Sequence, residues 1–332
     1  MGRPPPRRNN GCMQPEWSPR ISWTDLPGHV REGIEQIIGA PVMEARGQQG
    51  GFSPGTADRV LTASGQRAFV KAVSPQLNEH SPGIHRKEAA VAAALPAGVP
   101  APALIGTYDD GEWVALVRSD VEGRHPHVPW HAVEVHLVLD ALLKISRTPL
   151  PPELGQLPTL ETELTDPFRG WTRVRRSPPE GCDPWVLCNL DTLERLAEQG
   201  LRDVVGGSLA HTDIRADNIL ITAADGAVLV DWPWAAVGAP WVDALTVLVN
   251  VRVFDPDFDV DALLKSHDVF GTATPENVNG FLSGLAAYFI DAARQPPPPG
   301  LPTVRAFQQR QGEAVIHWLR DRLPPSGPGP LH

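Results

Sequence analysis

Residues 211–218 read His-Thr-Asp-Ile-Arg-Ala-Asp-Asn, and further along the chain Asp231 ends an apolar run. Between these features, two short apolar segments, 219–222 and 227–230, flank the turn Ala-Ala-Asp-Gly. Two such segments around a Gly-containing turn are typical of a β-hairpin. A hairpin would bring Asp231 back beside Asn218, so the spacing predicts a compact polar cluster held by two strands.

The residue types in this cluster point to a chemistry. An H-x-D-x-x-x-x-N loop followed by an Asp at the end of a strand is how kinase-like enzymes arrange phosphoryl transfer. In that arrangement Asp213 is the base that takes a proton from a substrate hydroxyl, and Asn218 and Asp231 hold magnesium. The alternative is an Asp-rich loop that only caps the hairpin. The combination of loop, hairpin and terminal Asp favours the catalytic interpretation.

The bulk composition narrows the class of protein. A chain of 332 residues is long enough for two lobes with a real core, and 42% hydrophobic with 20% charged residues fits a soluble globular protein. The net charge of -10 argues against nucleic acid or an anionic membrane as the main partner. An acidic chain is compatible with a cationic small molecule as its substrate.

Cysteine use and the termini favour a cytoplasmic protein. The three cysteines, Cys12, Cys182 and Cys188, are odd in number and show no metal-binding spacing, so we expect reduced thiols. The first 20 residues lack the apolar core of a secretory signal. The apolar stretch 228–254 contains Asp, Arg and further polar residues, so it is predicted to be buried protein instead of a membrane span.

The first third of the chain alternates strand-like and helical patterns. A helical spacing over 26–38 is ended by Gly39, and an Ala-rich helix is predicted over 85–95. Strand-like runs separated by turns predict a small antiparallel sheet, and they cover residues 41–45, 57–62, 67–73, 100–107 and 113–118.

After Gly123 helices dominate, beginning with a strong helical spacing over 130–145. We therefore expect a disordered tail over 1–20, an N-lobe over 21–122, a C-lobe over 123–323 and a flexible tail over 324–332. The Pro-rich segment 148–184 is either a functional loop or partly helical.

Several residues of the N-lobe are candidates for a phosphate site. Gly50, Gly51 and Ser53 lie between the first two strands, where backbone N–H groups can approach phosphate, although a simple turn gives the same pattern. Lys71 sits between apolar neighbours on the third strand, as a phosphate-binding lysine or as the outward residue of an amphipathic strand. Glu88 on the following helix is its candidate partner or an ordinary exposed carboxylate.

A hinge is expected over 116–121, between the lobes. There Val117 and Ser119 would offer backbone groups to the purine ring of a nucleotide.

Together these residues resemble the aminoglycoside phosphotransferase and choline kinase-like family of small-molecule kinases. The resemblance runs from about Gly50 to Leu245. It rests on Gly-Gly-Phe-Ser (50–53), Phe-Val-Lys (69–71), Glu88, Leu-Ala-His-Thr-Asp-Ile-Arg-Ala-Asp-Asn-Ile-Leu (209–220), Val-Asp-Trp (230–232) and Gly-Ala-Pro-Trp-Val-Asp-Ala-Leu (238–245).

The resemblance implies an α+β, bilobal protein-kinase-like fold with a small antiparallel-sheet N-lobe and a mostly helical C-lobe. It also implies ATP or GTP between the lobes, Mg²⁺, and transfer of the γ-phosphate to a small-molecule hydroxyl. The acceptor would be an aminoglycoside-like antibiotic or a hydroxylated metabolite, and the sequence leaves open whether the role is resistance or metabolism.

The family roles carry over residue by residue. Asp213 becomes the catalytic base, Asn218 and Asp231 the metal ligands, Lys71 the phosphate lysine and Glu88 its partner. His211 would be structural, and Asp243 would brace the catalytic loop.

Three positions depart from the family pattern. Thr212 replaces the usual glycine, and Pro233 stands where a second acidic residue is common. Arg215 stands where histidine is common, and its cation can still offset charge on the γ-phosphate during catalysis. None of the three removes a group that the chemistry requires.

Other functions are less compatible with the same residues. Only a short stretch separates Asp231 from Asp243, without an Ala-Pro-Glu segment, which speaks against a protein kinase. The intact catalytic residues speak against the alternative of a nucleotide-binding pseudokinase that serves as a regulatory or scaffold module. Four histidines after the hinge are expected on the surface, and Asp259 is expected to cap a helix.

Overall fold

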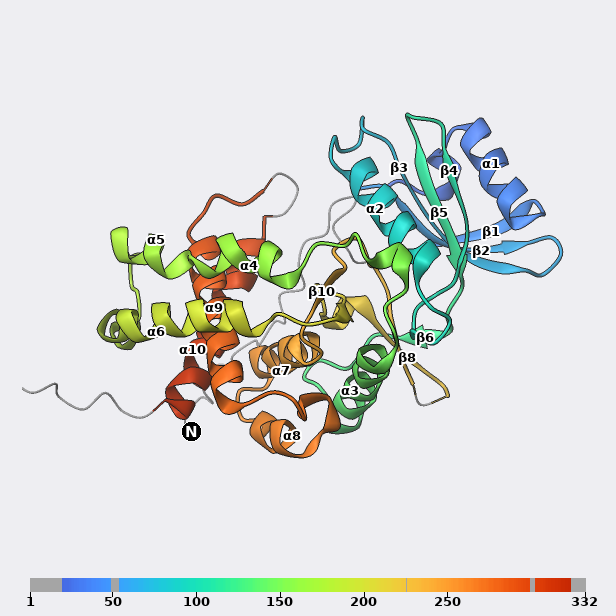
Figure 1. Cartoon of the computed structure of the whole chain (residues 1–332). Helices are drawn as coiled ribbons and strands as arrows, with labels where there is room; N and C mark the ends of the chain where they lie inside the picture. Colours follow the sequence, from blue (N-terminus) through green and yellow to red (C-terminus); the bar gives the residue numbers. More distant parts are fainter. Residues whose placement is uncertain (1–19, 49–53, 225, 299–301, 324–332) are drawn as a thin grey trace, which may run out of the picture.

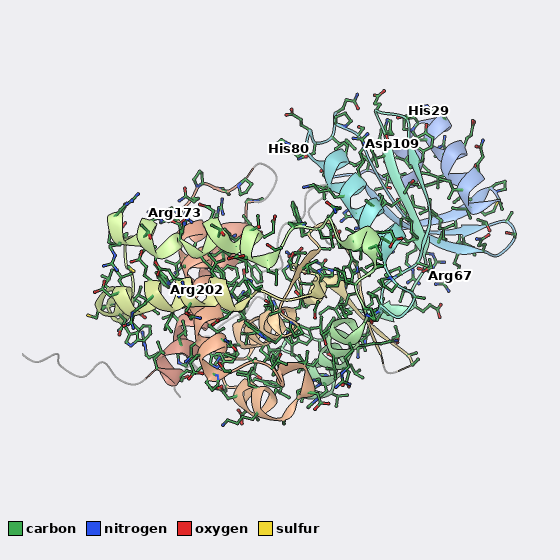
Figure 2. All side chains as sticks on the ribbon, viewed as in Figure 1. His29, Arg67, His80, Asp109, Arg173 and Arg202 are labelled. Carbon is green, nitrogen blue, oxygen red and sulfur yellow. The ribbon has the colours of Figure 1, made fainter. Side chains whose placement is uncertain are left out.

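A computed structural model of the chain describes residues 20–48, 54–224, 226–298 and 302–323. Its elements form two parts, a strand-rich part that ends with Ser119 and a helical part that begins at Gly123 (Figure 1). Charged side chains such as Arg67, Asp109 and Arg202 lie on the surface of the two parts (Figure 2). The arrangement has the small antiparallel sheet and the helical remainder predicted from the sequence.

The strand-rich part contains one five-stranded antiparallel sheet in the order β1-β2-β3-β5-β4. Its strands are β1 (Val42–Gly47), β2 (Thr56–Thr62), β3 (Arg67–Val73), β4 (Leu104–Asp109) and β5 (Val114–Ser119). Strand β3 is central, so its backbone is paired with a strand on each side. Its side chains alternate between the two faces of the sheet, as in any strand.

The two faces of the sheet are covered by different helices. Ala68, Val70 and Ala72 of β3 are buried in a core with helix α1 (Gly28–Ile38), which ends at Gly39 in a left-handed conformation. Because side chains alternate along a strand, Lys71 points to the opposite face. Helix α2 (Ser81–Ala94) packs on that second face (Figure 1).

The helical part is organised around α9 (Pro275–Ala293), which packs against α4, α5, α6 and α10. Gly200 of α6 and Gly280 of α9 allow close contact, since a Cβ on Gly200 would lie 2.3 Å from the Gly280 carbonyl carbon. The remaining helices are α3 (Ala132–Arg147), α4 (Leu160–Phe168), α5 (Gly170–Arg176), α6 (Pro184–Asp203), α7 (Val242–Phe254), α8 (Val260–Ser266) and α10 (Val304–Arg322).

The hairpin predicted over 219–230 is present. Strands β8 (Ile219–Thr222) and β9 (Ala227–Leu229) pair antiparallel, and β6 (Gly123–Arg124) adds to β8 as a third strand. The short strands β7 (Ser208–Ala210) and β10 (Ala236–Gly238) pair beside them. These small sheets hold the loop 211–218 where the two parts of the molecule meet.

Some predicted boundaries were wrong. The helix expected over 85–95 begins at Ser81, because Pro82 is tolerated in the first turn, where its missing N–H costs no hydrogen bond. The strand expected over 100–107 begins only at Leu104 and ends at Asp109. The Pro-rich segment 148–184 contains helices α4 and α5 and a 3-10 turn (Pro152–Leu154), so it is partly helical.

Two further expectations concern sulfur and membranes. Cys182 and Cys188 are both free thiols, as predicted, and Cys12 lies outside the described residues. Across the described ranges, none of the helices is both long and apolar enough to cross a membrane. The tail 324–332 and residues 1–19 also lie outside the described residues.

Candidate active site

The loop that follows β7 is fastened to the helical part through Asp243 of α7. The Asp243 carboxylate accepts hydrogen bonds from the backbone N–H of His211 at 2.6 Å and of Thr212 at 3.0 Å. Burial of this carboxyl raises its pKa to about 6, although the two donors oppose the rise. The bracing role expected of Asp243 is therefore present in the structure.

His211 is fully buried and serves as a structural link. Its Nε2 lies 2.9 Å from the carbonyl oxygen of Val230, and its Nδ1 accepts a 3.3 Å hydrogen bond from the Asp213 N–H. Burial lowers the pKa of His211 to about 4, so the ring is neutral at pH 7. A neutral ring with Nε2 protonated satisfies both contacts and ties the loop to the hairpin.

Two residues of the site have a left-handed backbone conformation that residues other than glycine rarely adopt. The φ angles are +68° at Thr212 and +70° at Asp231. For a β-branched residue such as Thr212 the left-handed region is strained, and glycine, the residue usual in the family at this position, would adopt it freely. The Thr212 hydroxyl compensates by donating a 2.7 Å hydrogen bond to the carbonyl of Trp234.

Asp213 has a partner on each carboxylate oxygen. Its Oδ1 lies 2.7 Å from Nη1 of Arg215, and its Oδ2 accepts a 3.0 Å hydrogen bond from Nδ2 of Asn218. Burial raises the pKa of Asp213 to about 6, and the Arg215 guanidinium works against that rise. A carboxylate with this pKa is mostly ionised at pH 7 and is a stronger base than an ordinary Asp. Arg215 also forms an ion pair with Asp217 at 3.0 Å.

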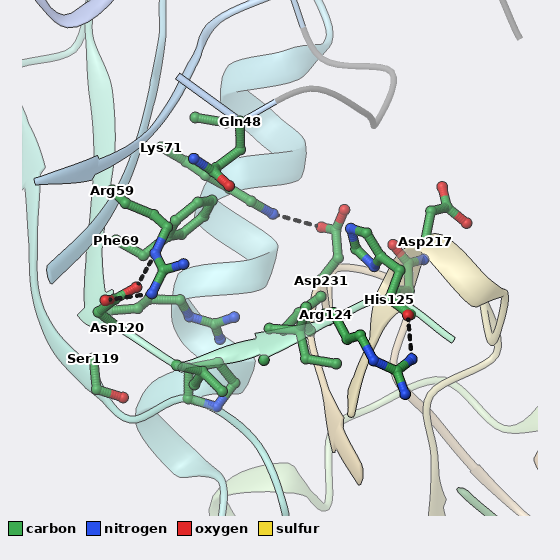
Figure 3. A pocket seen from close by; sticks show the side chains of 18 of the residues that line it. Gln48, Arg59, Phe69, Lys71, Ser119, Asp120, Arg124, His125, Asp217 and Asp231 are labelled. Atoms are coloured by element: carbon green, nitrogen blue, oxygen red, sulfur yellow. Dashed lines mark hydrogen bonds and ion pairs between the residues drawn. The ribbon is translucent and has the colours of Figure 1, made fainter. Parts of the chain in front are cut away.

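Lys71 connects the sheet to the loop region. Its Nζ lies 3.1 Å from Glu88 Oε2 and 2.9 Å from Asp231 Oδ1 (Figure 3). Burial opposes charge on this ammonium, but the carboxylates of Asp231 and Glu88 raise its pKa above the usual value. Burial likewise works to raise the pKa of Asp231, yet the Lys71 ammonium holds it below the usual range. The expected ion pair between Lys71 and Glu88 is thus formed.

Asn218 and Asp231 offer the oxygen atoms that Mg²⁺ prefers. Both line the same cavity, and Asp231 keeps 36% of its side chain exposed. The Nδ2 group of Asn218 donates to the carboxylate and to the carbonyl oxygen of Asp213, which turns its Oδ1 the other way. The donor set of these two residues therefore fits a divalent cation.

A cavity of about 220 Å³ lies between the sheet and the hairpin. Arg59 of β2 and Asp120 form a bidentate ion pair across it, at 2.7 and 2.8 Å, close to Phe69 (Figure 3). The contact between Lys71 and Asp231 lies further along the cavity, between this ion pair and Asp217 (Figure 3). Phe69 thus offers an aromatic face beside one ion pair, and Lys71 and Asp231 offer charged groups further along the cavity.

Only some of the predicted site residues line the cavity. Lys71, Ser119, Asn218 and Asp231 line this cavity. Val117 does not, because its side chain is buried in the core beside α1 and its backbone is paired with β3 and β4. Glu88 stands behind Lys71, and Gly50, Gly51 and Ser53 lie outside the described residues.

Several residues that line the cavity were missed by the sequence analysis. Arg20 was assigned to a disordered tail, but its side chain lines the cavity, and burial lowers its pKa. Phe69 could have been found, because it alternates with Lys71 and must share its face of β3. Further side chains that were missed include Gln48, Arg59, Arg118, Asp120, Arg124, His125 and Asp217.

Most of the remaining expectations from the sequence hold, including those for the histidines after the hinge, of which His125 lines the cavity. The histidines after the hinge are exposed, although His127, His131 and Glu134 bring their ligand atoms within 4.8 Å of one another. Asp259 caps α8 by accepting from Ala262 N at 3.0 Å. Trp234 lies on the surface with 45% of it exposed, and the Lys87 ammonium is 5.8 Å from the centre of its ring.

Comparison with known proteins shows that the chain belongs to an enzyme family. A model of the phosphotransferase enzyme family matches residues 48–281. Among curated proteins, none matches the chain.

Solved structures share the fold at low sequence identity. An aminoglycoside phosphotransferase from Alicyclobacillus acidocaldarius is 16% identical with a TM-score of 0.55, covering 85% of this chain and 92% of that one. Aminoglycoside phosphotransferase APH(4)-Ia is 13% identical with a TM-score of 0.56, covering 87% and 98%. Spectinomycin phosphotransferase APH(9)-Ia, in complex with ADP and spectinomycin, is 14% identical with a TM-score of 0.54, covering 89% and 98%. The predicted kinase-like fold is thereby confirmed.

Proposed function

Because the chain belongs to the phosphotransferase enzyme family, we propose that it transfers the γ-phosphate of ATP or GTP to a hydroxyl group of a small molecule. The observation that carries this proposal is the contact of Lys71 with both Glu88 and Asp231, next to the paired Asp213 and Asn218. One cation for phosphate, two oxygen ligands for metal and one base are the groups that phosphoryl transfer needs.

In this proposal residues 21–122 form the nucleotide-binding lobe and residues 123–323 the catalytic and substrate-binding lobe. The cavity that we assign to the nucleotide has lining residues from both ranges. Phe69 offers an aromatic face to the purine base, and Lys71 lies two residues further along β3, toward the phosphates. Structural neighbours were solved with ADP or AMP-PNP, which supports a nucleotide as the cofactor of this chain.

Mg²⁺ would be held by Asn218 and Asp231, and it would supply positive charge that offsets the charge of the phosphates during transfer. Lys71 would lose its direct contact with Asp231 when the metal and phosphates enter, and it would keep Glu88 as its anchor. The pair Lys71–Asp231 therefore marks the place of the phosphates in the absence of nucleotide.

The transfer step follows from the position of Asp213. The hydroxyl oxygen of the acceptor attacks the γ-phosphorus, the bond to the β-phosphate oxygen breaks, and the nucleoside diphosphate leaves. The hydroxyl proton passes to the Asp213 carboxylate, whose raised pKa of about 6 suits it to accept that proton at neutral pH. Arg215 orients this carboxylate through its 2.7 Å ion pair and brings positive charge near the transferred group.

The acceptor is proposed to be a hydroxylated small molecule, either an aminoglycoside-like antibiotic or a metabolite. Structural neighbours were solved with hygromycin B or with spectinomycin, which supports the antibiotic class. Asp231 and Asp243 are separated by little more than the strand β10, a stretch too short for the long activation loop of a protein kinase. The short connection favours a small acceptor over a protein.

The test is γ-phosphate transfer from labelled ATP and GTP in the presence of Mg²⁺ to aminoglycosides, macrolides, amino alcohols, sugars and a metabolite extract. We expect a labelled product from at least one class, no product from Asp213→Ala, and nucleotide binding that survives in that variant. Asp191→Ala, at an exposed carboxylate far from the loop, is the matched control. Normal turnover by Asp213→Ala would refute the assignment of the base. Magnesium-dependent nucleotide binding without any product would favour a pseudokinase.

A further inference from the structure

Arg118 occupies an unusual place for a charged residue. It lies in the middle of the molecule near the end of β5, where only 2% of its side chain is exposed, yet it lines the proposed nucleotide cavity. In the sheet register Arg118 stands opposite Phe69 of β3. Directly opposed residues of antiparallel strands share one face, so Arg118 is on the cavity side together with Phe69 and Lys71.

The guanidinium of Arg118 is only partly satisfied. Its Nη1 donates a 3.0 Å hydrogen bond to Glu88 Oε1. Its Nε and Nη2 are buried and have no hydrogen-bond partner among the described residues. These two nitrogens form one edge of the planar group, and their parallel N–H bonds can bind two acceptors at once.

Other arginines of the strand-rich part show how this edge is normally used. Arg59 directs Nε and Nη2 to the two carboxylate oxygens of Asp120, and Arg86 does the same with Asp109. Arg118 lines the cavity, and no carboxylate of the described residues meets this buried edge. Leaving donors of a buried cation unpaired is unfavourable, so we expect a ligand to supply the two missing acceptors.

The position of Arg118 indicates which part of a nucleotide supplies them. Lys71 and Asp231 mark the phosphate end of the cavity, whereas Arg118 is paired in register with Phe69, the aromatic residue proposed to face the base. Lys71 is two residues further along β3, which corresponds to roughly 7 Å along a strand. Nη1 of Arg118 shares Glu88 Oε1 with the Lys71 ammonium. The Nε–Nη2 edge is on the opposite side of the planar guanidinium, away from that contact, so we assign this edge to the base end.

The two common purines differ at the edge that a guanidinium can read. Guanine presents two neighbouring acceptors, O6 and N7, which match the parallel donors of an arginine. Adenine presents N7 beside an amino group, which is itself a donor and would oppose one N–H of the guanidinium. Building on the proposed phosphotransferase function, we propose that Arg118 is a specificity-determining residue that selects guanine, so that GTP is the phosphate donor.

The first test compares wild-type binding of GDP, ADP and inosine diphosphate by calorimetry with Mg²⁺, without any acceptor. We expect GDP to bind at least about tenfold more tightly than ADP. Inosine diphosphate should follow GDP, because hypoxanthine keeps O6 and N7. Equal binding, or preference for ADP, would overturn the inference and leave the proposed phosphotransferase intact. Failure to bind any of the three would overturn both.

The second test removes the donor edge. In Arg118→Met, Lys71 still neutralises Glu88, and the preference for GDP over ADP should fall to within about twofold. Arg118→Lys keeps the charge beside Glu88 without the two-pronged edge, so it should lose the preference as well. Arg86→Met, which removes the same edge at an exposed pair, should keep it. Thermal unfolding and circular dichroism would establish that each variant is folded.

The alternative role of Arg118 is a contact with phosphate, and the same data separate it from base recognition. A phosphate contact predicts that Arg118→Met weakens GDP and ADP by the same factor, and that outcome would overturn the inference. If Arg118→Met proves unfolded, the wild-type comparison of the three diphosphates decides the question by itself.

Discussion

The proposed catalytic loop, residues 211–218, and the roof of the proposed nucleotide cavity, formed by Phe69 and Arg118 of the sheet, are built in opposite ways. In the loop, His211, Asp213 and Asn218 already have protein partners for their side chains, and Asp243 holds the loop backbone. In the roof, Arg118 lines the cavity, and its buried Nε and Nη2 have no hydrogen-bond partner in the described part of the chain. In the proposed function, the groups assigned to the chemical step are therefore preorganised by the protein, whereas the groups assigned to nucleotide recognition depend on the nucleotide for their partners.

Lys71 joins these two regions. It comes from the sheet, and Glu88 on α2 anchors it there, but its shortest contact is with Asp231 beside the loop. Removing this lysine should therefore show how much phosphate transfer the loop supports without a charged group from the sheet.

The largest effect is expected from Lys71→Met. Loss of the cation removes charge stabilisation of the phosphates, so kcat/KM for phosphate transfer should fall by about 10²- to 10³-fold. The fold should survive, because Arg118 still pairs with Glu88 at 3.0 Å. Steady-state kinetics and thermal unfolding would measure the two effects.

Lys144→Met, at an exposed residue of α3, serves as the matched control and should behave like the wild type. Activity of Lys71→Met within threefold of the wild type would mean that the loop works independently of the sheet. The contrast between the two regions would then lose its functional meaning.

A smaller effect is expected from Asp243→Asn, which weakens the brace under the loop. The folded-state pKa of Asp243 is raised to about 6 from an ordinary value near 4. The folded protein therefore holds this proton more tightly than the unfolded chain, and the stability gained from it is present below pH 4 and lost as the pH rises through 6. Two pKa units correspond to about 3 kcal/mol.

Asn does not titrate, so the free energy of unfolding of the wild type relative to Asp243→Asn should fall by up to about 3 kcal/mol between pH 4 and pH 6.5. Urea denaturation of both proteins at several pH values would measure it. A difference that is constant with pH, or that grows as the pH rises, would contradict a buried carboxyl with a raised pKa.

The same contrast explains what the sequence could and could not predict. The loop and its hairpin are encoded within a short stretch, so Asp213, Asn218 and Asp231 were identified and fall together in the structure. The ion pair of Lys71 with Glu88 was also predicted, from the spacing of a strand and the helix that follows it.

The roof was predicted less well, because its residues meet only through strand pairing. Val117 and Arg118 are neighbours in sequence, but alternation turns the first into the core and the second into the cavity. A one-residue difference in register would have exchanged them, and the sequence did not fix that register. Arg20 was missed for a related reason, since a Pro- and Arg-rich tail gives no sign of which residue packs on the sheet.

The smallest effect is expected at Thr212, where the preorganised loop carries its own cost. A φ of +68° is unfavourable for any side chain with a Cβ, by about 1–2 kcal/mol, and glycine escapes that cost. Replacing Thr212 by glycine also removes its hydrogen bond to the Trp234 carbonyl, which works in the other direction. Comparison with the wild type alone would therefore mix two contributions of similar size.

Thr212→Ala and Thr212→Gly both lack the hydroxyl, so their difference isolates the backbone. Because alanine retains the Cβ, we expect Thr212→Gly to be the more stable of the two by about 1 kcal/mol in urea denaturation, after part of the relief is offset by the greater freedom of glycine in the unfolded chain. If alanine were equal or better, the loop would not hold the left-handed conformation in solution. Its preorganisation would then have to come from Asp243 and His211 alone, and the loop would resemble the roof in depending on its ligand.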